Sequence, residues 1–186
     1  MRVRGTRYRL HQNRVSKKMP GIEFSELPQS ARVWVYGADR DLSPESEQKM
    51  LAAVDQFLAQ WAAHGVPLHT ARRWDEGRFL TIGVDSTKEG ASGCSIDVLY
   101  RSLKALEPSL GGAHIVTSGL IYYRRADGAI HSVTRDEFSD LAAKGEIDLN
   151  TEVYDLSVTS LQEWEGRFKS RAGDSWHASL MPAARA

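Results

Sequence analysis

The only cysteine of the 186-residue chain, Cys94, lies where a thiol could act as a nucleophile. It follows a buried apolar run, 79–84, and precedes a segment whose apolar residues recur at helical spacing from Ile96 to Leu110. A thiol in the first turn of a helix meets unpaired backbone N–H groups, which favour the thiolate form. The sequence therefore offers a thiol-dependent enzyme as one hypothesis. The alternative is that Cys94 only fills a gap in the core.

A nucleophilic thiol needs a base, and the tail of the chain supplies the candidate pair His177 and Asp174. In cysteine acyl-transfer enzymes a histidine takes the proton of the thiol, and a third group orients the imidazole ring. Nothing in the spacing brings this tail to Cys94. The same two residues are equally explained by a docked tail whose polar groups bond locally.

The connection 85–97 around the cysteine is also typical of a binding site for a small anion or a partner segment. Its glycines and serines precede the predicted helix, so free amides and hydroxyls would face a phosphate or a carboxylate. We expect the loop after the strand 32–37 to share this concavity. The candidate ligand-binding residues are Lys88, Ser92, Gly93 and Ser95, with Asp39 and Arg40 from that second loop. The alternative is that the serines only cap the helix.

Two carboxylates raise the further hypothesis of a shared magnesium ion. Asp39 and Asp85 each follow a predicted strand, and neighbouring strand ends would bring them together, as in two-carboxylate phosphoryl-transfer sites. Aspartates after strands are also ordinary turn residues. His64 and His69 lack the spacing of ligands on one helix, and one cysteine cannot form a cysteine-rich zinc site. We therefore predict neither a metal nor a cofactor.

These residues must be positioned by alternating strands and helices. A helix should start at Ser43 and Pro44, a cap followed by proline, and end at His64 and Gly65. Around it the sequence predicts strands at 32–37, 68–74, 78–84 and 115–123 and a second helix at about 95–107. A turn at 75–77 makes the second and third strands a hairpin. This β-α-β-β-α-β order predicts a ferredoxin-like body with strands 32–37 and 78–84 paired at its centre.

The α+β chain divides into three predicted parts: a basic, disordered arm at 1–28, the body at 29–124 and a small extension at 125–186. The extension has the order hairpin, helix, strand. Its helix should begin at a capping box formed by Thr134 and Glu137. Two tryptophans in the following tail predict that the extension packs on the body.

Charge is uneven along the chain although the formal net charge is zero. Residues 1–18 carry 7 basic residues and no acidic one, which leaves 17 basic against 24 acidic residues in the rest. An acidic body disfavours nucleic-acid binding except through the arm. A single cysteine is typical of a protein in the reducing cytoplasm, and no apolar run is long enough to span a membrane. Composition does not predict the oligomeric state.

Four stretches of the chain are similar to a small bacterial protein family with no established activity: 32–36, 61–68, 90–97 and 174–177. The resemblance covers about 27–180. Some members of that family carry the label of an ABC transporter ATPase. A phosphate-binding loop of that kind needs a lysine after its last glycine, which 90–95 lacks, so we expect no ATP hydrolysis. From residue 115 onward the order of elements also resembles small peptide-binding adaptor modules.

Overall fold

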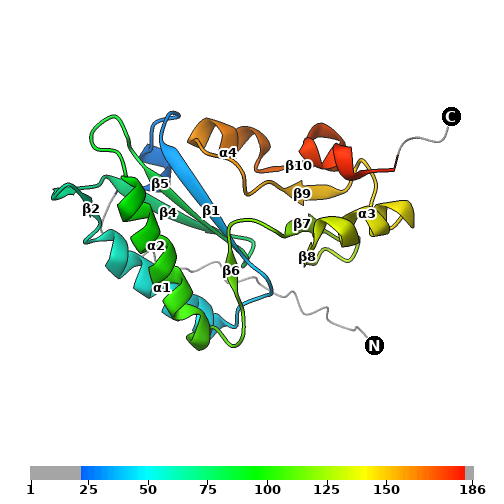
Figure 1. Ribbon diagram of the computed structural model, residues 1–186, viewed down its shortest axis with the longest axis horizontal. Coiled ribbons are helices and arrows are strands. Elements are labelled where there is room, and N and C mark those ends of the chain that lie inside the picture. The colour runs from blue at the N-terminus through cyan, green and yellow to red at the C-terminus, as the bar shows by residue number, and fades with distance from the viewer. Residues whose placement is uncertain (1–21, 183–186) are drawn as a thin grey trace, which may run out of the picture.

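Two antiparallel four-stranded sheets form the frame of the molecule, whose computed structural model describes residues 22–182 (Figure 1). The predicted mixed α+β class is therefore confirmed. The first sheet has the order β4-β5-β1-β6, with β4 at Thr70–Asp75, β5 at Phe79–Val84, β1 at Arg32–Ala38 and β6 at Ile115–Val116. The second has the order β10-β9-β7-β8, with β10 at Lys169–Arg171, β9 at Glu152–Tyr154, β7 at Ile121–Arg124 and β8 at Ile130–Val133.

The centre of the first sheet is the antiparallel pair β1 and β5, as the sequence predicted. Arg32 lies opposite Val84, and Gly37 lies opposite Phe79. All six residues of β5 are buried, which explains its unbroken apolar sequence. The predicted hairpin between β4 and β5 is also present. Its turn residues Glu76 and Gly77 have φ values of 56° and 67°, the left-handed backbone that a two-residue hairpin turn requires.

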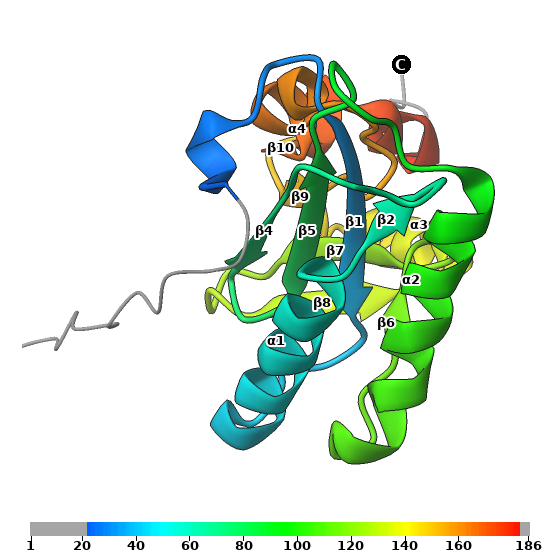
Figure 2. The same ribbon diagram turned by 90° about the vertical axis from the view of Figure 1, so that its left-hand side faces the viewer.

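Helices α1 (Pro44–Leu58) and α2 (Gly93–Leu106) lie side by side on one face of the first sheet (Figure 2). The Oγ atom of Ser43 accepts a hydrogen bond of 3.2 Å from the amide of Ser46, which confirms the predicted helix start. Both helices bury a stripe of apolar residues against the sheet, including Met50, Val54, Leu58, Leu99 and Leu103.

The predicted end of α1 is wrong. His64 and Gly65 do not cap the helix; with φ values of 51° and 81° they form the turn of a short hairpin between β2 (Ala62–Ala63) and β3 (Val66–Pro67). Proline at position 67 suits a short strand rather than a helix. Trp61 is buried at the base of this hairpin, and its Nε1 donates to the carbonyl of Ser95 at 3.2 Å. The indole therefore ties the end of α1 to the start of α2.

The predicted strand 115–123 is in fact two strands that belong to different sheets. β6 pairs with β1, whereas β7 pairs with β8 and β9. Between them Gly119 has a φ of 90°, so the chain changes direction where a single strand would have continued straight. The predicted boundary at 124 consequently falls at the end of β7, inside the second sheet.

The C-terminal part of the chain, residues 121–182, contains the second sheet. It covers the face of the first sheet that α1 and α2 leave free (Figure 1). One face of the second sheet packs there through Tyr122 and Tyr154, against Val33, Val35 and Phe79. Its other face packs against α3 (Arg135–Ala143), which starts at the predicted capping box. Helix α4 (Leu161–Arg167) adds Leu161 to the core shared with the first sheet. Of the two tryptophans in the predicted tail, Trp164 packs against this shared core, whereas Trp176 is exposed.

Residues 22–28 correct the predicted extent of the arm. The amide of Ile22 donates to the carbonyl of Thr70 at 3.3 Å, and Phe24 packs edge to face on Trp164 at 5.3 Å. Leu27 is buried over the backbone of β5. This segment belongs to the fold because its apolar side chains close the shared core. The basic stretch 1–18 lies outside the described residues.

Candidate functional site

The connection from β5 to α2 contains the first group of candidate residues. Asp85 is buried at its start, and its Oδ1 accepts hydrogen bonds from the amide of Thr87 at 3.0 Å and from its hydroxyl at 2.6 Å. These bonds from Thr87, first from its side chain and then from its backbone, lower the pKa of the Asp85 carboxyl. Asp85 therefore acts as a turn residue.

The two serines of this connection cap the helix. The Oγ of Ser92 accepts from the amide of Ser95 at 3.2 Å, and the Oγ of Ser95 donates to the carbonyl of Ser92 at 2.9 Å. Ser95 is buried, so its hydroxyl does not face a ligand in solvent. Of the anion cradle that the sequence suggested, the hydroxyl of Ser95 is used as a donor in the cap. The amides of Gly93 and Cys94, the hydroxyl hydrogen of Ser92 and the ammonium group of Lys88 have no hydrogen-bond acceptor among the described residues.

Cys94 is exposed in the first turn of α2, whereas its predicted base is remote from it. His177 is fully buried in the turn 176–180, stacked on Trp176 with ring centroids 3.9 Å apart. Its Nδ1 lies 2.9 Å from the Oγ of Ser175. Asp174 is exposed in the segment Ala172–Asp174, just before this turn. Figure 1 shows this C-terminal segment away from the start of α2. The predicted group of Cys94, His177 and Asp174 is therefore not assembled, because the tail folds onto α3 and the second sheet.

The second predicted loop also lies away from the first. Since β1 and β5 are antiparallel, Asp39 and Arg40 follow the end of β1 that meets Phe79, whereas Asp85 follows the end of β5 that meets Arg32. Only parallel strands would have placed both connections at one edge of the sheet. A shared concavity and a magnesium ion shared by Asp39 and Asp85 are thus contradicted. Within residues 22–182 no three histidine, cysteine or acidic side chains form a group that could hold a metal.

The carboxylate of Asp39 accepts a hydrogen bond from the amide of His114 at 2.9 Å, and its backbone carbonyl is held by an arginine that sequence reasoning missed. Arg78 is only 4% exposed and donates to the carbonyls of Ala38 and Asp39, each at 3.0 Å. The same guanidinium donates to Asp41 and to the carbonyl of Ile130 in β8, each at 2.9 Å. This arginine joins the first sheet to the second. The sequence signal that could have revealed Arg78 is its position between the turn glycine at 77 and an apolar strand, because a charged side chain there must find buried partners.

The aromatic residues on the free face of the first sheet belong to the core. Phe79 of β5 stacks on Tyr154 at 4.5 Å and meets Tyr122 edge to face at 5.1 Å. An open sheet with exposed aromatic rings would be a platform for nucleic-acid bases, but here the C-terminal part covers these rings. This arrangement excludes that use of the sheet face.

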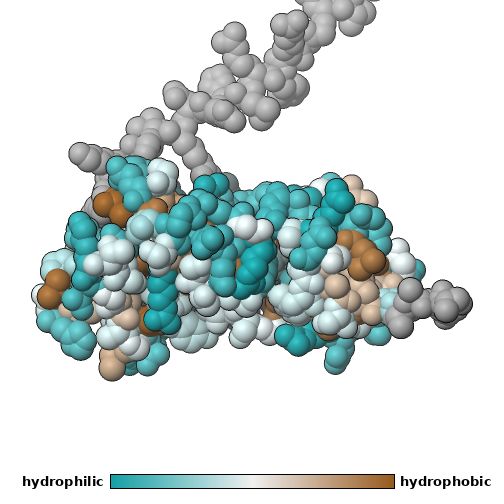
Figure 3. All heavy atoms as spheres, turned by 90° about the horizontal axis from the view of Figure 1, so that it is seen from above, coloured by the Kyte–Doolittle hydropathy of each residue, from teal (hydrophilic) through white to brown (hydrophobic). Residues whose placement is uncertain are grey.

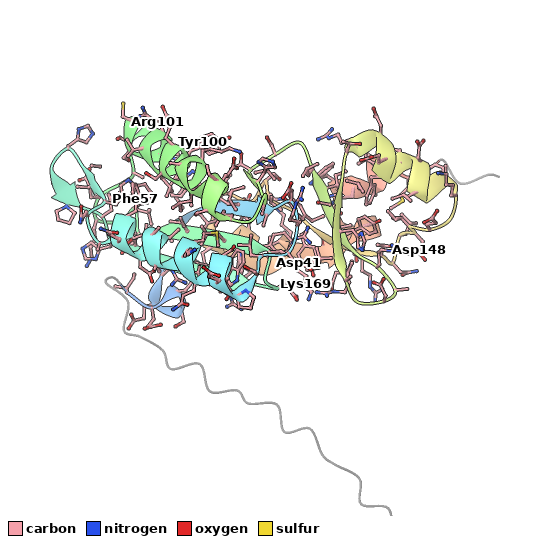
Figure 4. All side chains as sticks on the ribbon, turned by 90° about the horizontal axis from the view of Figure 1, so that it is seen from below. Asp41, Phe57, Tyr100, Arg101, Asp148 and Lys169 are labelled. Carbon is pink, nitrogen blue, oxygen red and sulfur yellow. The ribbon has the colours of Figure 1, made fainter. Side chains whose placement is uncertain are left out.

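The helix face of the same body is open, and a groove runs along it between α1 and α2. Two adjoining hollows of about 350 Å³ and about 300 Å³ share Phe57 and Gln60 in their walls. The second begins beside Ser95, at the end of the connection 85–97, and contains Val98, which is 44% exposed. Figure 4 looks onto the two helices, with Phe57 labelled on α1 and Tyr100 on α2.

None of the described residues that line the groove carries a charged side chain. Its larger apolar walls are Val54, Phe57, Trp61, Val98, Leu103 and Leu106, and the other lining residues are leucine, alanine, glutamine and serine. The charged residues of the two helices, such as Lys49 and Arg101, lie outside the lining. The face seen in Figure 3, by contrast, is largely hydrophilic with small separate apolar spots. The sequence pattern had assigned the apolar residues of both helices to the core alone, and so did not separate the half-buried Phe57 from the buried stripe.

None of the helices in residues 22–182 has the length and apolar character needed to cross a bilayer. No family model matches the chain, and no curated protein or solved structure that was compared with it matches either.

Proposed function

We propose that this protein is a binding protein that holds an amphipathic helix of a partner protein in the groove between α1 and α2. The observation that supports this function is the uncharged lining on two helices that carry charges elsewhere. The centres of protein interfaces are depleted of charged residues, and grooves between helices commonly take the apolar face of another helix. Gln56 and Gln60 provide polar groups at the rim, and Phe57 provides an aromatic anchor.

We further propose that the first sheet and its two helices form a ferredoxin-like body. The strand order β4-β5-β1-β6, with α1 after β1 and α2 after β5, supports this assignment. In this arrangement the helices cover one face of the sheet, and the C-terminal part occupies the other. The outer surface of the helices is then the face of the body on which a partner could dock.

The partner segment of this proposal replaces the small anion as the preferred ligand of the 85–97 region. An anion would have two amides, the Ser92 hydroxyl and Lys88, whereas a partner helix would have the whole groove that starts at Ser95. The thiol-enzyme alternative has lost its predicted base, His177. We place the protein in the cytoplasm, since an exposed single thiol such as Cys94 is compatible with a reducing compartment.

Selection of helical peptides from a displayed library on the full-length protein tests this function. Selected peptides should carry apolar residues at i, i+3, i+4 and i+7. Gln56→Glu, which puts an unpaired charge in the lining, should weaken their binding by ~10-fold or more. Gln48→Glu is the matched control, because Gln48 is exposed on α1 outside the lining. Enrichment of no peptide, or equal binding to both variants, would reject the proposal.

A further inference from the structure

A second hollow of about 520 Å³ lies where β7 and β9 separate. The two strands pair only through Tyr122 with Tyr154 and Tyr123 with Val153. Beyond these pairs β7 continues into its turn with β8, and β9 is preceded by the loop 148–151. Figure 4 labels Asp148 in this region, at the opposite end of the molecule from Phe57. The hollow is therefore separate from the groove between α1 and α2.

One wall of this hollow is fixed by ion pairs. The Nε of Arg124 lies 2.6 Å from Glu152, and its Nη2 lies 2.9 Å from Glu76. Arg124 also donates to the carbonyl of Gly128 at 2.7 Å. The hydrogen bond to Glu152 is the main reason that the pKa of Arg124 is raised. This wall is ordered, and its opposite charges neutralise one another.

The remaining lining carries polar groups that have no hydrogen-bond or ion-pair partner in residues 22–182. They are the hydroxyl of Tyr123, the guanidinium of Arg125, the carboxylate of Glu146 and the side-chain amide of Asn150. Tyr123 is only 6% exposed, and its ring is held edge to face against Phe138 at 5.9 Å. Burial raises the pKa of its hydroxyl, Arg125 lowers it and Glu146 raises it, so both charges act on this hydroxyl.

We infer that this hollow binds a small zwitterion of the amino-acid class, with its carboxylate on Arg125 and its ammonium group on Glu146. A guanidinium matches a carboxylate with two parallel hydrogen bonds, and the Tyr123 hydroxyl is placed to add a third. Asp148 lines the same hollow, but its carboxylate already accepts from the amide of Asn150 at 2.9 Å and from the hydroxyl of Thr151 at 3.1 Å. The volume is within the range of pockets for small molecules.

Ligand-observed NMR with the full-length protein and each of the free L-amino acids tests this inference. At least one of them should bind saturably. Its analogue without the carboxylate and its analogue without the amine should each bind ~10-fold more weakly or worse, because each loses a charge-assisted contact. For L-leucine these analogues are isopentylamine and 4-methylpentanoate. Absence of saturable binding by every amino acid at tens of millimolar would overturn the assignment.

Two variants test whether the ligand binds in this hollow. Arg125→Gln and Glu146→Gln change exposed side chains that have no hydrogen-bond or ion-pair partner among the described residues, and each should weaken binding by ~10-fold or more. Arg171→Gln and Glu165→Gln are the matched controls, exposed residues of the same C-terminal part that lie outside the lining, and they should bind as the unchanged protein does. Unchanged binding by both Arg125→Gln and Glu146→Gln would also overturn the assignment.

Discussion

The ring of Tyr122 in the second sheet lies directly on Gly37 in the first. A Cβ atom at Gly37 would be 2.5 Å from the hydroxyl oxygen of Tyr122 and 2.5 Å from its ring carbon Cζ. Glycine at this position of β1 therefore allows the two sheets to approach. The same contact explains why the free face of the first sheet is not a ligand surface, because the tyrosine occupies it.

Gly37→Ala should destabilise the protein because neither the backbone of β1 nor the buried ring of Tyr122 can move away easily. We expect a loss of ~1–3 kcal/mol in the free energy of unfolding, as for overpacked cores. Urea denaturation followed by circular dichroism measures it. Gly166→Ala, in α4 with open space around the added methyl group, is the control and should be neutral or slightly stabilising. Equal stability of both variants would contradict the packing of Tyr122 on β1.

Arg78→Lys should also be costly, although it retains the charge. Lysine cannot reproduce four hydrogen bonds from one planar group, and the vacated carbonyls of Ala38 and Ile130 would lose their donor. We expect a loss of ~1–3 kcal/mol, the usual cost of leaving buried carbonyls without a donor. The control is Arg73→Lys, which changes the ion pair of the half-exposed Arg73 with Asp75, and the expected cost is below ~1 kcal/mol. A similar, small effect of both changes would show that Arg78 does not join the sheets.

Acidification should weaken the fold through His177. Burial lowers the pKa of its imidazole to about 4 from the usual 6.5, Asp155 acts in the opposite direction, and Arg135 adds to the lowering. Its Nε2 is buried without a hydrogen-bond partner among the described residues, so a proton there would be poorly accommodated. Above pH 6.5 both folded and unfolded states hold a neutral ring. Between that value and about 4 only the unfolded state takes up the proton, so the free energy of unfolding falls across this window.

Comparing the unchanged protein with His177→Phe separates the effect of His177 on the pH dependence of unfolding from the effects of the other histidines. Between pH 7 and pH 5 the unchanged protein should lose ~2 kcal/mol more than the variant, from the 1.36 kcal/mol that each pKa unit represents. Denaturant titrations at both pH values give this difference. Parallel pH dependence of the two proteins would show that His177 is not buried in its neutral form.

The N-terminal segment should divide into a dispensable and a required part. A chain that starts at Met19 should unfold at the same temperature as the full chain, because residues 1–18 lack apolar periodicity. Leu27→Ala should cost ~2–5 kcal/mol, since this buried leucine packs over β5. Thermal melts of the three proteins compare them. A lower midpoint for the Met19 chain would show that the first 18 residues contribute to the fold.

Local signals in the sequence predicted the elements that depend on neighbouring residues. Ser43 with Pro44 started α1, the turn at Gly77 closed the hairpin, and Thr134 with Glu137 capped α3. The residues that form each cap or turn lie within about four positions of one another, so these features can be recognised without knowing any tertiary contact. The pairing of β1 with β5 also followed from the order of elements, because chain connectivity restricts the sheet.

The location of the candidate site depends on how distant segments pack together, which the spacing of residues along the chain does not reveal. Whether Asp39 lies beside Cys94 depends on the relative direction of β1 and β5, and the antiparallel pairing separates them. Residues 115–123 are apolar enough for one strand, and only the second sheet explains why the chain turns at Gly119. The groove was missed for a related reason. Phe57 follows the same helical spacing as its buried neighbours, and the gap between two helices is not a property of either sequence.

The groove between α1 and α2 is tested most directly by calorimetric titration of two alanine-to-glutamate variants with a selected helical peptide. Ala105 lines the groove on α2, whereas Ala52 is exposed on α1 outside the lining. Both substitutions add the same charge to an exposed helical position, so their effects on the net charge match. If a helix binds in the groove, Ala105→Glu should weaken peptide binding by ~10-fold or more, and Ala52→Glu should leave it unchanged. Equal affinity of both variants for the peptide would show that the helix does not bind in the groove.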